Sequence, residues 1–156
     1  TGGIADLAIT TAKLADGAVT NVKKGTPNYV EAAVSASTSS TSLVSMGSLS
    51  FTGLGRTCEI GIFVFFSSLS NGINIGTGGV TDGSVRIQFY DSTNAVVLSD
   101  FYVGYSNLNS TGFFPPIHIF TALSAGTRTI QIRASVGNAS CTFQLNSGCK
   151  LYVREL

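Results

Sequence analysis

Val85-Arg86-Ile87-Gln88-Phe89-Tyr90 alternates apolar and polar residues at every step. Successive side chains of a β-strand point to opposite faces, so the three apolar residues of this stretch share one face. The same alternation recurs in Ile130-Gln-Ile-Arg-Ala134 and Lys150-Leu-Tyr-Val-Arg154. Strands of this kind have one buried face and one face that meets solvent or a partner chain.

After residue 27 the pattern predicts strands throughout and almost no helix. The expected strands are 29–35, 41–46, 48–52, 58–66, 84–90, 95–98, 101–105, 117–121, 127–136, 140–145 and 150–155. A hairpin turn at Ser147-Gly148 is expected between the last two. Many short strands separated by Gly, Asn, Ser and Pro indicate an all-β protein, a β-sandwich of the jelly-roll kind.

Residues 60–66, Ile-Gly-Ile-Phe-Val-Phe-Phe, are apolar on both faces of the expected strand. A strand with this pattern is expected to be central in its sheet and covered on each side. In a two-layer sandwich the second cover has to come from outside the core, and a neighbouring subunit is the simplest source. The alternative source is a loop of the same chain.

Two decapeptides at the start of the chain, residues 4–13 and 14–23, are near copies of each other. Their large apolar residues fit neither a heptad nor a sustained helical stripe, which argues against a coiled coil. Each repeat is expected to form a helical turn, a tight turn and a short extended piece. Units this short cannot bury their apolar residues alone, so we expect copies of the chain to bury them against each other. The residues concerned are Ile4, Leu7, Ile9, Leu14, Val19 and Val22.

The stretch from residue 9 to residue 20, Ile-Thr-Thr-Ala-Lys-Leu-Ala-Asp-Gly-Ala-Val-Thr, resembles the shaft repeats of bacteriophage tail and head fibres. In such shafts three chains wind about one axis. The resemblance covers roughly the first 25 residues. It implies a homotrimer in which the six apolar residues are shaft contacts. A low-complexity linker is the alternative, but a linker would not need its Leu, Ile and Lys residues in register.

The last third of the chain resembles the closing strands of trimeric jelly-roll heads that are similar to the tumour-necrosis-factor fold and recur at fibre tips. The matching segments are 125–133, 141–145 and 150–156. Together the resemblances imply a shaft segment, residues 1–25, that trimerises the chain and attaches it to other virion proteins. Residues 26–156 would form the head, after a hinge at Gly25-Thr-Pro27.

The composition excludes several classes of function. Only 11% of the residues are charged and 44% are hydrophobic, and nine basic residues nearly balance eight acidic ones. Nucleic-acid binding needs a clustered basic face, so no nucleic-acid partner is expected. No apolar run approaches the roughly 20 residues that span a bilayer, so no membrane insertion is expected.

The sequence contains few residues in patterns that are typical of catalytic sites. His118 is the single histidine, and the sequence contains no Gly-x-Ser-x-Gly motif to support a triad around it, so it is expected to be a structural strand residue. Cys58, Cys141 and Cys149 match no zinc or redox spacing and are expected to be reduced, largely buried thiols. Gly76-Thr-Gly-Gly79 lacks the Lys of a phosphate loop. We therefore expect no enzyme activity, no catalytic residue, no cofactor and no metal.

Two polar segments, 67–84 and 104–112, are candidate binding loops. Within the second, an aromatic face with nearby amides could stack on a sugar and bond its hydroxyls. The candidate receptor or glycan residues are Tyr105, Asn107 and Asn109. The alternative is that both segments are solvated turns.

These features lead to the hypothesis of a non-enzymatic, trimeric bacteriophage fibre protein that mediates attachment to a host surface glycan or protein. Its location would be the virion, with assembly in the host cytoplasm. Two alternatives remain open at this stage. One is a carbohydrate-binding, lectin-like module, and the other is a head fibre or capsid decoration with no receptor.

Overall fold

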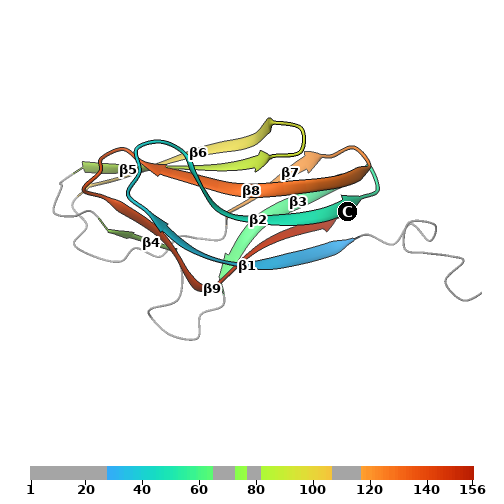
Figure 1. The fold of residues 1–156 in the computed structure, drawn as a ribbon, viewed down its shortest axis with the longest axis horizontal. Helices are drawn as coiled ribbons and strands as arrows, with labels where there is room; N and C mark the ends of the chain where they lie inside the picture. Colours follow the sequence, from blue (N-terminus) through green and yellow to red (C-terminus); the bar gives the residue numbers. More distant parts are fainter. Residues whose placement is uncertain (1–27, 65–72, 77–81, 107–116) are drawn as a thin grey trace, which may run out of the picture.

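The structure is a computed structural model that describes residues 28–64, 73–76, 82–106 and 117–156 (Figure 1). The predicted shaft segment, including Ile4, Leu7, Ile9, Leu14, Val19 and Val22, lies outside the described residues, as do Asn107 and Asn109. The regular structure of the described residues consists of nine β-strands. None of these residues forms a helix with the length and apolarity of a membrane span.

The strands form two antiparallel sheets. Sheet 1 has the order β1 (Tyr29–Thr38), β9 (Thr142–Glu155), β3 (Thr57–Val64) and β7 (Ile117–Ala122), with the short β4 (Ile73–Gly76) also paired to β9. Sheet 2 has the order β2 (Val44–Gly53), β8 (Gly126–Val136), β5 (Asp82–Asp91) and β6 (Val96–Ser106). Figure 1 shows sheet 2 lying over sheet 1 as a second layer.

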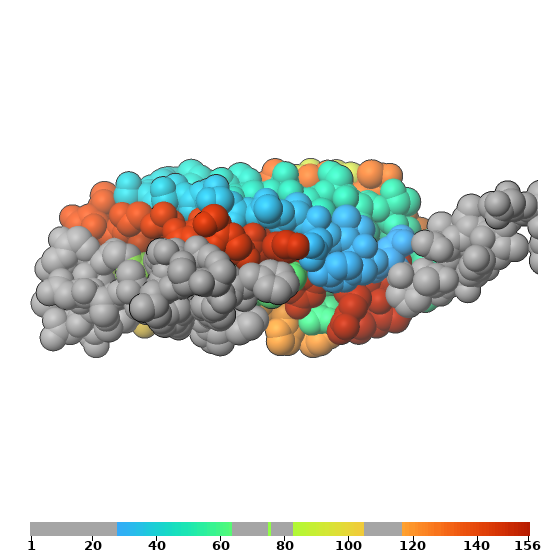
Figure 2. Space-filling model, turned by 90° about the horizontal axis from the view of Figure 1, so that it is seen from below, coloured from blue at the N-terminus to red at the C-terminus, as the bar shows by residue number. Residues whose placement is uncertain are grey.

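The path of the chain through the two sheets is that of a jelly roll. The chain changes sheet at every connection between strands except those from β3 to β4 and from β5 to β6. The first and last strands, β1 and β9, lie side by side in sheet 1, as their blue and red surfaces do in Figure 2. A five-stranded and a four-stranded layer connected in this way make a jelly-roll β-sandwich, so the predicted fold class is confirmed.

The core between the sheets is built from the alternating residues of the sequence. Val85, Ile87 and Phe89 of β5 are fully buried, and they face Ile60 and Ile62 of β3 across the core cluster. Burying each side chain of this size contributes roughly 1.5–3 kcal/mol. The predicted alternation is also confirmed in β8 and β9, where the buried residues are Ile130, Ile132, Ala134, Leu151 and Val153.

The sequence predicted breaks at three places where the structure has a continuous strand, and these three predictions are wrong. β2 and β6 are each continuous where two strands were expected, and β9 runs straight through the expected hairpin at Ser147-Gly148. Val34 pairs with Cys149 and Ala36 pairs with Leu145, so the three residues 146–148 stand opposite one residue of β1. The turn-forming residues therefore make a β-bulge, in which Gly148 has φ 97°.

The two segments expected to be loops are partly strand. β4 lies inside segment 67–84, β5 already begins at Asp82, and β6 extends to Ser106. β4 was missed because a four-residue strand bounded by glycine carries almost no periodicity. The segment is a strand because it pairs with β9, and the local sequence does not indicate this pairing.

All three cysteines are free and buried, as expected. Burial raises the pKa of the Cys58 thiol to about 11 and also raises the pKa of Cys149. Both thiols therefore stay protonated and behave as small apolar residues of the core.

The start of β1 is fastened to the end of β9. Asn28 N–H donates to Glu155 Oε2 (3.2 Å), and the Asn28 side chain donates to the Thr52 carbonyl (2.7 Å). The second oxygen of Glu155 accepts from Leu54 N–H (2.5 Å), which satisfies a carboxylate that is 2% exposed. The segment that precedes residue 28 therefore joins the sandwich at the end that carries the C-terminus (Figure 1).

Candidate functional site

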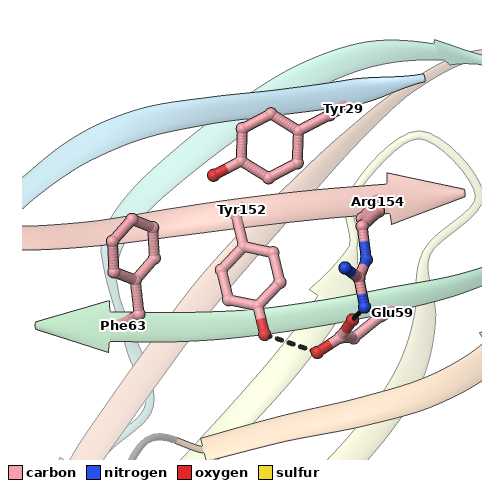
Figure 3. A pocket seen from close by; sticks show the side chains of 5 residues that line it. All are labelled: Tyr29, Glu59, Phe63, Tyr152 and Arg154. Carbon is pink, nitrogen blue, oxygen red and sulfur yellow. Dashed lines mark hydrogen bonds and ion pairs between the residues drawn. The ribbon is translucent and has the colours of Figure 1, made fainter.

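A depression of about 210 Å³ lies on the outer face of sheet 1. Its lining comes from three neighbouring strands, with Tyr29 from β1, Glu59 and Phe63 from β3, and Tyr152 and Arg154 from β9 (Figure 3). Three of the five side chains are aromatic, and the other two form an ion pair. We refer to these five residues as the aromatic depression.

Strand register brings these residues together. Arg154 pairs with Tyr29 on one side and with Glu59 on the other, while Tyr152 pairs with Gly61. Alternation along β3 turns Glu59, Gly61 and Phe63 away from the core. The same alternation that buries Ile60 and Ile62 therefore builds the depression.

Gly61 makes room for the Tyr152 ring. A Cβ placed on Gly61 would lie 2.8 Å from the Tyr152 hydroxyl oxygen and 2.8 Å from the Ile117 carbonyl oxygen. Because glycine carries no side chain, the ring lies across β3 and its hydroxyl donates to Glu59 Oε1 (2.8 Å). Figure 3 shows this bond and the Arg154 contact meeting on the same carboxylate.

The rings are in contact with one another. Tyr29 and Tyr152 are stacked, with centroids 6.3 Å apart and planes at 29°. Phe63 presents an edge to Tyr152 at 5.7 Å. Pairs of this geometry add about 0.5–1.5 kcal/mol beyond the area they bury, so the three rings stabilise one another as an apolar cluster.

The charged groups of this face neutralise each other. Hydrogen bonds from Tyr152 and Arg154 hold the pKa of Glu59 below its ordinary value. Burial, and then the bond to Glu59, raise the pKa of Tyr152 to about 12. Lys150 pairs with Glu31 beside the depression. Two acids are thus matched by two bases, so this patch carries no net charge at neutral pH.

The apolar surface continues onto the edge strand β7. Phe120 is 59% exposed and His118 is exposed, and their rings meet edge to face at 5.5 Å. Phe120 pairs with Glu59 and His118 pairs with Gly61, so both lie directly beside the depression. His118 is a strand residue, as expected.

The outer face of sheet 2 is different in character. Ser50 and Thr129 share a hydrogen bond across β2 and β8 (2.8 Å), and Thr52 and Thr127 form a second one (3.1 Å). Hydroxyl ladders of this kind suit a face in contact with water.

The structure does not test the residues that the sequence proposed as a glycan loop. Tyr105 lies near the end of β6 and pairs with Gly83, while Asn107 and Asn109 are outside the described residues. The residues of the aromatic depression were not predicted as a site. Their signal was the doubly apolar segment 60–66. Its outward residue Phe63 lines the depression, as does Glu59, which directly precedes the segment.

The depression offers stacking and burial. Its one carboxylate is paired with arginine, and the described residues contain no group of three His, Cys, Asp or Glu side chains that could hold a metal. Such a surface can bind a flat apolar ligand or another protein chain.

Neither a known protein family nor a curated protein matches the sequence. The chain is similar in fold to solved structures of the VP2 subviral particle of infectious bursal disease virus, with 10% identity and a TM-score of 0.45 over 83% of this chain and 37% of that chain. It is also similar to the structure of the Gx strain of the same virus, with 9% identity and a TM-score of 0.46 over 82% of this chain. The chain spans 37% of the length of each of these two structures.

Proposed function

We propose that this chain is a non-enzymatic virion fibre protein of a bacteriophage, in which residues 26–156 form a head that projects from the particle and attaches it to the host surface. The observation that carries the proposal is the decapeptide repeat of residues 4–23. A repeat at fixed period is typical of an extended repeat architecture. Units this short cannot bury their apolar residues within one chain, so other copies of the chain are needed to bury them. Residues 1–25 also supply the contact with other virion proteins.

The connection at Asn28 supports the division into shaft and head. The last residue before β1 is held by hydrogen bonds to Glu155 and Thr52, so any chain entering the head enters it at a fixed point. If three chains share an axis up to residue 27, their three β1 strands start close to that axis. Sheet 1, which contains β1, is then the sheet nearest to the neighbouring heads.

The outer face of sheet 1 is suited to contact between those heads. Tyr29 and Phe120 expose 52% and 59% of their surface, which is apolar area that a partner can remove from water. The acids and bases between them are already paired, so burial leaves no charge without a partner. The proposed homotrimer therefore uses the shaft and this face together.

Three heads on one shaft would give attachment through several weak contacts. Once one head is bound, the others meet the surface at a high effective concentration, which strengthens binding without a new contact. The attachment role thus follows from the trimer.

The test is the molar mass in solution, measured by light scattering on the full chain and on a variant with Leu14→Asp and Val19→Asp. We expect a trimer for the full chain and loss of the trimer, or much weaker association, for the variant. The matched control Asn21→Asp changes a polar position of the same repeat and keeps the trimer. A monomeric full chain would contradict the fibre proposal.

A monomeric lectin-like module is the second candidate, and the aromatic depression favours it. In a monomer the stacked pair Tyr29 and Tyr152 stays open to a sugar ring, with Glu59 and Arg154 beside it. A monomer whose sugar binding is abolished by Tyr152→Ala would establish this candidate in place of the fibre.

A further inference from the structure

The outer face of sheet 2 carries one exposed aromatic ring among polar groups. Tyr102 of β6 is 69% exposed, more than any other large apolar side chain of the described residues. The Arg86 guanidinium, from β5, lies 5.4 Å from the centre of this ring. The register pairs Arg86 with Tyr102, so the two side chains stand next to each other across the strands.

Arg86 is held in place by Asp100. Its Nε donates to Asp100 Oδ1 (2.9 Å) and its Nη2 donates to Oδ2 (2.5 Å). The hydrogen bond from Arg86 lowers the pKa of Asp100, so the carboxylate stays charged and continues to accept. Both side chains remain about one-third exposed, at 35% and 28%, so a ligand can reach them.

Open space lies beside the ring. Gly104 is two residues further along β6, on the side of the strand that Tyr102 occupies. A Cβ placed on Gly104 would meet no atom of the described residues within 4 Å. Part of the sheet surface next to Tyr102 is therefore bare.

An unsatisfied acceptor lies under these groups. Gln88 sits between Asp100 on β6 and Arg133 on β8, and only 2% of it is exposed. Its Nε2 donates to Asp100 Oδ2 (3.3 Å), whereas its Oε1 is buried and has no hydrogen-bond partner among the described residues. Buried acceptors are nearly always satisfied, so a donor that reaches this oxygen gains a hydrogen bond.

We propose that Tyr102, Arg86, Asp100 and Gln88 form a binding site for a neutral sugar. The apolar face of the sugar ring stacks on Tyr102. One sugar hydroxyl donates to Asp100, and a sugar oxygen accepts from Arg86. A second hydroxyl donates to Gln88 Oε1, which it reaches when the exposed side chains of Arg86 and Asp100 shift. Arg86 and Asp100 cancel in charge, which favours a neutral ligand over an anionic one.

The location agrees with attachment by a trimer, and the biological role of the site rests on the function proposed above. Sheet 2 is the layer opposite the aromatic depression (Figure 1), so copies that meet through sheet 1 turn their sheet 2 faces outward. Sites that are individually weak would then act together.

The experiment is saturation-transfer NMR on the full chain with the methyl glycosides of glucose, galactose, mannose and N-acetylglucosamine. We expect transfer to the ring protons of at least one sugar. Tyr102→Ala should lower the affinity about tenfold, because ring stacking is lost, while Tyr102→Phe should keep it. Val97→Ala trims a side chain of the same strand that is 50% exposed, and it should leave the affinity unchanged.

A second variant separates binding from folding. Gln88→Leu has a similar shape and removes the unsatisfied oxygen, so it should weaken sugar binding several-fold without lowering the thermal midpoint. No transfer to any of the four sugars, or equal affinity in the Tyr102→Ala variant, would overturn the sugar site. Because the molar mass is measured on the same sample, a trimer that binds no sugar overturns this site alone, whereas a monomer overturns the fibre.

Discussion

At the scale of single residues, the aromatic depression depends on a glycine. Gly61 lies under Tyr152, and the ring reaches Glu59 only because no Cβ stands in its path. The Ile117 carbonyl oxygen on β7 closes the same space from the other side. One missing side chain therefore sets the position of the Tyr152 ring.

Gly61→Ala should lower the free energy of unfolding by about 1–3 kcal/mol, because the new methyl group overlaps both backbone and side-chain atoms. The measurement is urea denaturation followed by tyrosine fluorescence. Gly104→Ala is the matched control, since its methyl group enters open space and should change the stability by less than about 0.5 kcal/mol. Equal effects of the two substitutions would contradict the packing described for Tyr152.

The carboxylates of the outer faces predict how stability depends on pH. Hydrogen bonds from neighbouring groups lower the pKa of Glu59, Glu31 and Asp100 in the folded protein. The stabilisation from Glu59 is fully present above its unfolded value of 4.5 and is lost as the pH falls below that value towards its folded pKa. Acid should therefore destabilise the fold.

Glu59→Gln should weaken this acid dependence, because the side chain at position 59 no longer titrates. Urea midpoints measured from neutral pH to below pH 4.5 would show a shallower fall for the variant than for the unchanged protein. Parallel curves would show that the bonds from Tyr152 and Arg154 do not stabilise the charged form of Glu59.

At the scale of elements, β9 shows where local signals mislead. Asn146-Ser147-Gly148 has the composition of a hairpin turn, yet the strand continues through it. The flanking residues pair with the same partner, β1, on both sides of the bulge, and this long pairing outweighs the local preference for a turn. Cys149 and Leu145 consequently both face the core.

The bulge predicts a strong preference for glycine at position 148. Its φ of 97° is a conformation that residues with a side chain rarely adopt, so Gly148→Ala should cost about 1–2 kcal/mol. Thermal unfolding of the variant measures this. Ser147→Ala, in the same bulge but without positive φ, should have a much smaller effect. A neutral Gly148→Ala would mean that the bulge relaxes freely.

Among the strands, alternation was enough to identify β5, β8 and the end of β9. Their apolar residues are large and strictly spaced, so one face is unambiguous. β4 and the continuity of β2 and β6 were not predictable in this way. Gly47 and Asp100 interrupt the apolar pattern locally, while the ladders to β8 and β5 continue past them.

At the scale of the whole molecule, the two outer faces of the sandwich differ. Sheet 1 presents aromatic rings with paired charges, and sheet 2 presents hydroxyl ladders with one exposed ring. This difference is the basis for assigning contact between copies to sheet 1 and ligand contact to sheet 2. A substitution on one face therefore tests the role proposed for that face without changing the other face.

Phe120→Asp should weaken self-association of the full chain by more than about tenfold while leaving the fold intact, because the ring is 59% exposed in a single chain. Light scattering over a dilution series measures the change. Tyr102→Asp alters an exposed ring on sheet 2 and should not change the molar mass. The opposite outcome would move the contact between copies to sheet 2.

The sequence by itself determined the fold class, because alternation is a local property of the chain. The division into repeat and head, read from a ten-residue period, stays a prediction. Which residues share a face across strands was decided only by the tertiary structure. Tyr152 and Glu59 are 93 residues apart, and they meet because β9 pairs with β3 in one register. Register depends on the packing of all the strands around one core, so no local stretch of sequence contains it.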